Sequence, residues 1–310
     1  MYRIDACPCC RSKDVLSYPA VVAPFLAHYA VRTPPSRCAL MECRNCTFRF
    51  FDARLTPDEV ERLYSGYRGE DYFGSRHQHE FWYTRKFNLG IGHDQPAIAF
   101  RKRVVESLLQ RHIDLGSIDT VLDYGGDEGQ FIPDALGKKK YVFELSDAAP
   151  VPGVTKIRSE ADLRAHRFDL VMICHVLEHC SDPCAALQRI QELRGGRPLF
   201  CYVEVPYERY DLRFAGRGKL FAWYVAGLLR CPPLLMAADF VSTAIRLKTN
   251  WIPPLGILKC HEHLNYFNEQ SLEVLLRAAG FDVMECTTAR LPSYLASGRV
   301  LQALARTRVD

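Results

Sequence analysis

After residue 119 the chain alternates short apolar runs with helical stretches, and this alternation restricts the fold more than any other feature of the sequence. Four of the runs are almost continuously apolar: 120–124, 141–145, 169–174 and 199–205. Strands covered by helices on both faces have this pattern, whereas a strand with one face in water alternates apolar and polar residues. One intervening helix is well marked, with Asp182 and Pro183 at its start and Gly195 and Gly196 after its end. The series predicts a doubly wound α/β sheet.

A long, apolar, proline-marked segment at 208–258 interrupts this series. The pattern resumes with a predicted helix at 269–279 and two further strands at 281–287 and 300–305. We expect one large α/β domain over 113–310, in which 208–258 is a helical insertion. A helical and aromatic connecting region at 57–112 precedes it, and a separate module occupies 1–56.

The composition narrows the class of protein. Of 310 residues, 48% are hydrophobic and 25% are charged, which is typical of a soluble globular chain. The formal net charge of +4 comes without a cluster of basic residues, so we expect no nucleic-acid partner. We find no run of about 18 apolar residues and therefore expect no transmembrane segment. The thirteen cysteines are odd in number and the start lacks a signal peptide, which indicates reduced thiols in the cytoplasm.

The first predicted strand ends in a glycine-rich turn, Asp-Tyr-Gly-Gly-Asp-Glu-Gly, over 123–129. We expect a short helix from Gln130, whose N-terminus would offer free N–H groups to a ligand. A dinucleotide site needs a different glycine spacing and would place a diphosphate beside Asp127 and Glu128. A ligand with an ammonium and a sulfonium group suits these carboxylates, so the electrostatics favour S-adenosylmethionine.

The spacing Asp123-x-Gly125-x-x-x-Gly129 resembles the first motif of class I S-adenosylmethionine-dependent methyltransferases. Glu144 lies 21 residues after Asp123, where that superfamily places an acid on the ribose hydroxyls. The run at 169–174 and the following His-Val-Leu-Glu-His resemble its fourth-strand motif. The resemblance implies a seven-stranded, Rossmann-like sheet. It also implies a cofactor site formed by Asp123, Gly125, Gly126, Asp127, Gly129, Glu144, Cys174 and His175, in which Asp127 replaces the usual middle glycine.

Two Cys-x-x-Cys pairs lie in the first 50 residues: Cys7/Cys10 and Cys43/Cys46. Each such turn presents two sulfurs to one ion, and two turns can close a tetrahedral, structural zinc site. Alternatives are reduced cysteines without metal, or a ligand set in which Cys9 or Cys38 takes part. After the second pair, Thr56, Pro57 and Glu59 predict a capped helix over 57–65.

The cysteine pairs and the residues after them resemble the zinc-binding N-terminal module of sugar C-methyltransferases and of surface-polysaccharide methyltransferases. The resemblance extends from residue 7 to about residue 305. It implies C- or O-methylation of a sugar, sugar-nucleotide or glycan acceptor. The segment Cys260-His-Glu-His263 matches the family's Glu-His active-site segment, although Cys260 stands where the family often has a tyrosine.

This match makes His263 the candidate base. We interpret Glu262 as its hydrogen-bonded carboxylate, which would raise the basicity of the imidazole so that it removes a proton near neutral pH. His179 is the next catalytic candidate. Weaker candidates for contact with the acceptor are aromatic or titratable residues near these segments: Tyr72, Glu204, Tyr207 and His261.

The sequence is compatible with several alternatives. The Glu-His segment can be a surface loop with packed histidines. The string His175-x-x-Glu178-His179 matches a zinc-hydrolase pattern, although that pattern requires a helix where we expect a strand end. The chain can also bind cofactor as a scaffold subunit without transferring methyl. The insertion is interpreted as a lid or a homodimer face in preference to a peripheral membrane contact through 219–236.

Overall fold

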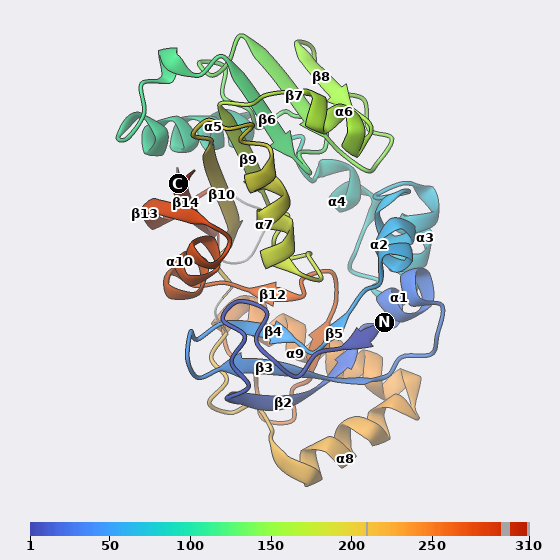
Figure 1. Ribbon diagram of the computed structural model, residues 1–310. Coiled ribbons are helices and arrows are strands. Elements are labelled where there is room, and N and C mark those ends of the chain that lie inside the picture. Colours follow the sequence, from blue (N-terminus) through green and yellow to red (C-terminus); the bar gives the residue numbers. More distant parts are fainter. Residues whose placement is uncertain (209, 293–297, 309–310) are drawn as a thin grey trace. The chain divides into compact units, whose positions relative to one another are not determined.

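The computed structural model describes residues 1–208, 210–292 and 298–308 (Figure 1). The chain forms two compact units, each assembled from separate stretches of sequence. Unit 1 contains Met1–Cys7, Arg11–Leu89 and Glu208–Tyr266. Unit 2 contains Pro8–Cys10, Gly90–Tyr207 and Phe267–Asp310.

Unit 2 is built on a seven-stranded sheet, which confirms the predicted α/β fold. Strands β8, β7, β6, β9 and β10 are parallel, and β14 runs antiparallel to both of its neighbours. In sheet order the strands are β13 (Phe281–Arg290), β14 (Arg299–Thr307), β10 (Phe200–Pro206), β9 (Leu170–Cys174), β6 (Thr120–Tyr124), β7 (Lys139–Phe143) and β8 (Val154–Ile157). All the strands predicted after residue 119 are present, while the short β8 has no counterpart among them.

The order of these strands fixes where a ligand can bind. From β6 the chain adds β7 and β8 toward one edge and then returns to add β9 and β10 on the other side of β6. In open α/β sheets, ligands bind at the carboxyl ends of the strands where the winding direction changes. In unit 2 this place is at the ends of β6 and β9.

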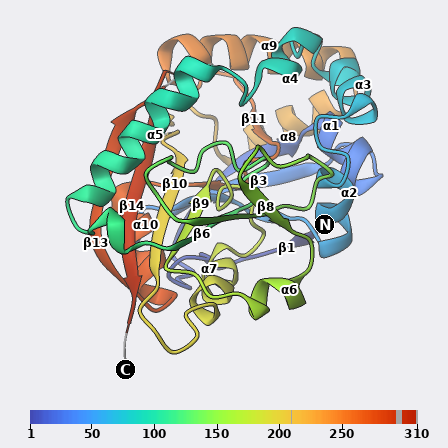
Figure 2. The same ribbon diagram turned by 90° about the horizontal axis from the view of Figure 1, so that it is seen from above.

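Helices cover both faces of the sheet (Figure 2). On one face α5 (Gln95–Gln110) packs Val105, Leu108 and Leu109 into a core shared with β6, β9, β10 and β14. On the other face lie α6 (Glu160–Ala165) and α7 (Pro183–Glu192). The predicted cap of α7 is confirmed, because the Asp182 side chain accepts a hydrogen bond from the Ala185 N–H. The remaining helices are α10 (Glu269–Ala278) and a 3₁₀ turn, η2 (Leu115–Ser117).

Unit 1 contains a five-stranded sheet and a separate two-stranded ladder. In sheet order the five strands are β11 (Leu258–Cys260), β2 (Val15–Val22), β3 (Arg37–Cys43), β4 (Arg49–Phe51) and β12 (Asn265–Tyr266). The ladder pairs β1 (Tyr2–Arg3) with β5 (Ala53–Arg54). The helices are α1 (Pro24–Leu26), the π-turn η1 (Ala27–Val31), α2 (Pro57–Tyr64), α3 (Glu70–His79), α4 (Arg85–Gly90), α8 (Gly218–Leu229) and α9 (Pro232–Thr249).

The chain segments that form unit 1 do not follow the predicted domain boundaries. Strand β11 pairs with β2, and β12 pairs with β4, so residues far along the chain complete a sheet begun by the N-terminal strands. The segment predicted as an insertion into the methyltransferase domain therefore belongs to the same compact unit as residues 11–89. Sequence patterns report local structure and carry no information about which strands will pair over such distances.

Candidate functional site

The glycine loop after β6 has a left-handed backbone at three positions. The φ angles are 71° at Gly125, 57° at Asp127 and 74° at Gly129. Gly126 is required for another reason, because an added Cβ would lie 2.1 Å from the Cγ of Asp123. Asp127 thus adopts the conformation that a glycine gives most easily, and aspartate is among the few residues that tolerate it. The substitution in the motif keeps the glycine-type backbone.

The helix predicted from Gln130 is wrong: residues 125–138 form turns up to the start of β7. Pro133 lacks an N–H group, and Gly137 has a φ of 68°, so neither residue favours a continuing helix. The N–H groups available to a ligand are therefore those of the loop itself.

Glu144 follows β7 and lies beside the glycine loop. Its carboxylate accepts hydrogen bonds from the N–H of Asp127, at 3.1 Å, and from the N–H of Ser146, at 3.0 Å. Glu144, predicted to bind the ribose, thus lies next to the glycine loop, predicted to bind the methionine end of the cofactor.

Asp123 supplies a buried acceptor next to this loop. Its side chain is 0% exposed, and within the described part of the chain neither carboxylate oxygen has a hydrogen-bond partner. Burial raises the pKa of Asp123 to about 7, although the charge of Arg101 opposes the shift. An unsatisfied buried acceptor is costly to a folded protein, so a ligand that donates hydrogen bonds fits this place.

A buried charge network connects the ends of β9 and β10. The Glu204 carboxylate forms an ion pair with the Arg101 guanidinium. It also accepts hydrogen bonds from the His175 Nε2–H at 3.1 Å and from the Tyr202 hydroxyl at 2.9 Å. Burial alone would raise the pKa of Glu204, but Arg101 and His175 outweigh it and hold that pKa far below its ordinary value. Glu204 was a predicted contact of the methyl acceptor. Its carboxylate is fully buried and is bonded to other side chains of unit 2.

His175, at the start of the loop after β9, is held between two carboxylates. Its Nδ1 lies 3.3 Å from Glu178 and its Nε2 lies 3.1 Å from Glu204. Burial and Arg101 oppose protonation, but the two carboxylates outweigh them and raise the pKa of His175. Residues 175–180 form a bend and a turn, so the helix required by the zinc-hydrolase pattern does not form there.

Sequence reasoning missed Arg101. It lies on α5 between the buried Ile98 and Val105. A charged residue at a core-facing position conflicts with the apolar pattern of the helix, and a buried arginine needs an anion beside it. This conflict is visible in the sequence and could have indicated the buried network.

The predicted base, His263, is hydrogen-bonded to Glu208 and not to the predicted partner, Glu262. In unit 1 the His263 Nδ1–H donates to Glu208 Oε2 at 2.8 Å. His263 opposes the effect of burial and lowers the pKa of Glu208 to about 2. Glu208 lies more than 50 residues before His263, and no local pattern in the sequence predicts the pairing.

Glu262 lies in a second cluster of unit 1. The Tyr72 hydroxyl donates to its Oε1, and Arg76 Nη1 donates to its Oε2 at 3.2 Å. Tyr72 comes from α3, so the structure brings a tyrosine to this glutamate although Cys260 occupies the usual tyrosine position. Burial and the charge of Glu262 raise the pKa of Tyr72 well above its ordinary value.

The same cluster includes His261, whose Nε2 lies 3.2 Å from Glu80. Lys259 also binds Glu80, at 2.7 Å, and Asp239, at 2.8 Å.

The other two predicted residues lie in unit 2. His179 is in the turn after β9, with its Nε2 3.9 Å from Glu178. The Tyr207 N–H donates to the Arg299 carbonyl.

The four cysteines of the two Cys-x-x-Cys pairs come together. Their sulfur atoms all lie within 4.8 Å of one another, and those of Cys7 and Cys46 are 3.6 Å apart. Four sulfurs placed tetrahedrally at about 2.3 Å from zinc are about 3.8 Å apart, so the cluster fits such an ion.

The backbone around the cysteines repeats itself. The N–H of Arg11 donates to the Cys7 carbonyl, and the N–H of Thr47 donates to the Cys43 carbonyl. Arg11 and Thr47 both have a left-handed φ, of 61° and 57°. The two turns therefore have equivalent geometry, and the group of Cys7, Cys10, Cys43 and Cys46 could hold a metal ion.

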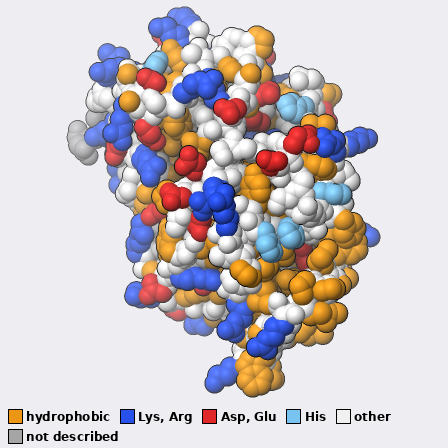
Figure 3. Space-filling model, turned by 90° about the vertical axis from the view of Figure 1, so that its right-hand side faces the viewer, with side chains coloured by type: hydrophobic (Ala, Val, Ile, Leu, Met, Phe, Trp, Pro, Cys, Tyr) orange, Lys and Arg blue, Asp and Glu red, His pale blue; other side chains and the backbone are white. Residues whose placement is uncertain are grey.

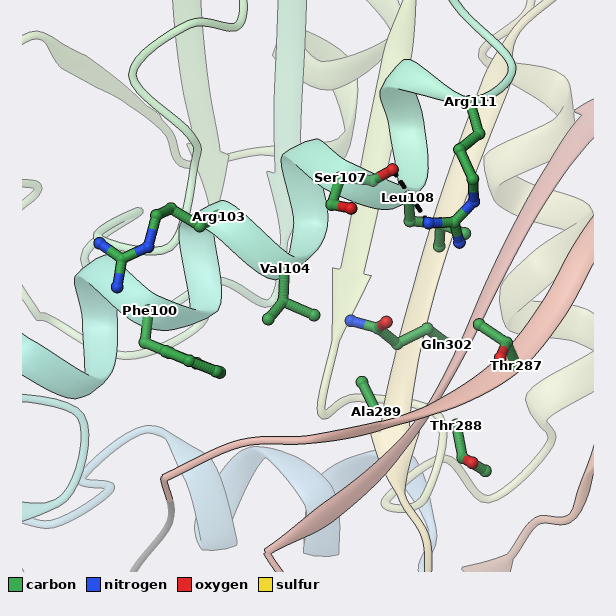
Figure 4. A pocket seen from close by; sticks show the side chains of 10 residues that line it. All are labelled: Phe100, Arg103, Val104, Ser107, Leu108, Arg111, Thr287, Thr288, Ala289 and Gln302. Atoms are coloured by element: carbon green, nitrogen blue, oxygen red, sulfur yellow. Dashed lines mark hydrogen bonds between the residues drawn. The ribbon is translucent and has the colours of Figure 1, made fainter.

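A cavity of about 370 Å³ lies between α5 and the strands β13 and β14 (Figure 4). None of the residues that line it belongs to the glycine loop. They are Phe100, Arg103, Val104, Ser107, Leu108, Arg111, Thr287, Thr288, Ala289 and Gln302. The cavity is thus not the predicted cofactor site.

A family model described as a methyltransferase domain matches residues 97–285, which is more than half of the chain. The chain belongs to this family. It is a class I S-adenosylmethionine-dependent methyltransferase. No curated protein matches the methyltransferase significantly.

Solved structures resemble the methyltransferase at low identity. One is 1,6-didemethyltoxoflavin-N1-methyltransferase from Burkholderia thailandensis, at 18% identity and a TM-score of 0.46, over 87% of this chain and 95% of that chain. Another is magnesium protoporphyrin IX methyltransferase from Synechocystis PCC 6803, at 13% identity and a TM-score of 0.39, over 70% and 89%. A third is the N-methyltransferase NodS from Bradyrhizobium japonicum WM9, at 13% identity and a TM-score of 0.38, over 69% and 89%. Nothing about the acceptor follows from them.

Proposed function

We propose that this methyltransferase transfers the S-adenosylmethionine methyl group to a carbon or oxygen atom of a sugar-type acceptor, with His263 as the base. The observation that carries the proposal is the 2.8 Å hydrogen bond between His263 and Glu208, in the segment that resembles the sugar C-methyltransferases. When bound, the cofactor supplies an electrophilic methyl group on its sulfonium.

His263 would remove the proton that the acceptor must lose. When Nδ1–H donates to Glu208, Nε2 becomes the basic nitrogen of the ring. It would take a proton from a hydroxyl group, or from a carbon beside a ketone. Glu208 then stabilises the imidazolium and keeps the ring oriented, as a carboxylate does in other base-catalysed sites.

Tyr72, Arg76 and Glu262 are proposed to bind and orient the acceptor. A carboxylate, a phenol and a guanidinium together offer both donors and acceptors, which suits the hydroxyl groups of a sugar. The ring of Tyr83 lies 4.0 Å from the Arg76 guanidinium and adds an aromatic surface. The cofactor itself is assigned to Asp123, the glycine loop, Glu144, Cys174 and His175, and structural zinc is assigned to the four cysteines.

The experiment incubates the enzyme with S-adenosylmethionine and sugar-nucleotide or glycan extracts and follows methylated products by mass spectrometry. We expect His263→Ala to lower kcat at least about a hundredfold while the affinity for S-adenosylmethionine stays unchanged. His93→Ala removes an exposed histidine outside these clusters and is the matched control. Product formation by His263→Ala at the wild-type rate would disprove the assignment of the base.

Two glutamate variants distinguish the proposed partners of the base. Because Glu208 raises the basicity of His263, Glu208→Gln should lower kcat and move the rise of kcat/KM to lower pH. Glu262→Gln should instead raise KM for the acceptor. Cofactor binding without any methylated product in the wild-type enzyme would favour the scaffold function instead.

A further inference from the structure

Helix α8 in unit 1 is apolar on both its buried and its exposed face. Phe221, Val225 and Leu228 are buried against Val21, Leu235 and Ile257. On the outside, Leu220 is 82% exposed and Trp223 is 74% exposed. A surface helix of a globular protein normally has polar residues on its outer face, so this helix has the composition of one that is covered.

Helix α9 continues the apolar surface after a sharp bend. Its exposed side chains include Leu234, Phe240 and Val241. Among the residues that the structure describes, no single helix is long and apolar enough to cross a membrane, but Gly218–Leu229 and Pro232–Arg246 meet that test together across a bend of 119°. Since one face of α8 is fixed to the core of unit 1, the pair would lie on a bilayer and not cross it.

The exposed charged side chains of α8 and α9 are basic, whereas Asp239 of α9 is buried and paired with Lys259. Residues 212–238 contain four basic residues and no acidic residue. Lys219 and Arg230 are exposed at the two ends of α8, while Arg213 is paired with Asp211. Figure 3 shows hydrophobic side chains gathered in the lower part of the view, where Figure 1 draws α8, with Lys and Arg side chains beside them.

This charge pattern decides between a bilayer and a second copy of the chain. A twofold-symmetric interface would bring the patch against itself and so place Lys219 and Arg230 near other basic residues. Anionic lipid headgroups are complementary to these charges, and a tryptophan is favoured at the boundary between headgroups and acyl chains. We propose that α8 and α9 dock the methyltransferase on an anionic membrane surface, with Leu220 and Trp223 inserted at the interface and Lys219 and Arg230 on the headgroups.

The test is co-sedimentation of the full chain with vesicles of phosphatidylcholine alone or of phosphatidylcholine with phosphatidylglycerol. We expect binding to the anionic vesicles, at least about tenfold stronger than to the neutral ones and weakened by added salt. The double variant Leu220→Ser, Trp223→Ser should lose this binding, and Lys219→Glu, Arg230→Glu should lose it as well. Leu89→Ser removes an apolar side chain that is 63% exposed on α4 and should bind as the wild type does.

All these positions are exposed, so the variants should keep the wild-type unfolding temperature, which is checked in parallel. Wild-type protein that stays in the supernatant with anionic vesicles overturns the proposal. So does a double variant that binds like the wild type. Analytical ultracentrifugation without lipid covers the remaining alternative: a dimer that the double variant dissociates would assign the surface to a second copy. The assay measures no methyl transfer, so its result is independent of the proposed function.

Discussion

Asp127 shows how one residue can depart from a motif and keep its backbone. Its φ of 57° is the left-handed value that favours glycine. Replacing Asp127 by Gly or by Val removes the same carboxylate, but only Val, which is branched at Cβ, resists this conformation. We expect Asp127→Gly to change the affinity for S-adenosylmethionine by less than about threefold and Asp127→Val to weaken it at least about tenfold. Calorimetric titration measures both, and equal affinities would contradict a role of the backbone.

Asp123 should make the stability of the apo enzyme depend on pH. Its pKa rises from 3.8 to about 7 on folding because of burial. Below pH 3.8 the group is protonated in both states, so it has no effect. As pH rises from about 4 to 7 the unfolded state loses the proton first, which lowers the free energy of unfolding by up to about 4 kcal/mol.

The Asp123→Asn variant should therefore be more stable than the wild type above pH 7, by about 2–4 kcal/mol, and equal to it near pH 4. Urea unfolding of the apo protein at pH 4.5, 6 and 8 follows the difference. A gain in stability that is the same at all three values would show that charge is not its cause. Asp134→Asn, at a carboxyl whose pKa is lowered by the hydrogen bond from Lys102, should show no such gain at pH 8.

The local motifs of the site could be predicted, and the long-range partners could not. Glycine spacing, the position of Glu144 and the cysteine pairs are properties of short segments. By contrast, Glu208 joins His263, and Tyr72 joins Glu262, only because the chain folds back over 55 and 190 residues. The proposed Glu262–His263 pair relied on sequence adjacency, and the structure gives the imidazole the distant glutamate.

At the scale of elements, the cap at the start of α2 was predicted from Thr56, Pro57 and Glu59 and is present as a capping box. The Thr56 side chain accepts from the Glu59 N–H, and the Glu59 side chain accepts from the Thr56 N–H. Thr56→Ala removes one acceptor for the free N–H groups of the first turn and should lower the free energy of unfolding by about 1 kcal/mol. Urea unfolding measures the loss, with Thr249→Ala at the end of α9 as a control expected to change it by less than about 0.5 kcal/mol. Equal losses in the two variants would argue against a capping role.

Strands and caps were easier to predict than the connection after the glycine loop. Buried parallel strands carry a continuous apolar signal, and β6 begins and ends where that signal does. The helix expected from Gln130 carried no comparable signal, and Pro133 and Gly137 disfavour it.

At the scale of the whole molecule, the two units combine segments that are distant in sequence. Unit 1 joins Arg11–Leu89 to Glu208–Tyr266 through the pairs β2–β11 and β4–β12. Cys43 ends β3, the strand between β2 and β4. A metal ion held by the four cysteines would therefore stabilise a sheet that includes residues from both segments, because ligand binding to a folded site adds to its folding free energy.

Removal of the metal should then loosen both segments of unit 1 together. After treatment with a zinc chelator, we expect amide hydrogen exchange in 11–89 and 208–266 to speed up at least about tenfold, while α5, β6, β9 and β10 keep their protection. The double variant Cys43→Ser, Cys46→Ser should show the same pattern without chelator. Cys286→Ser, in unit 2, should behave as the wild type. The contrary result would be faster exchange only up to about residue 56, with 208–266 as protected as the seven-stranded sheet. The domain boundaries expected from the sequence would then hold, and the pairing of distant strands would not determine the stability of unit 1.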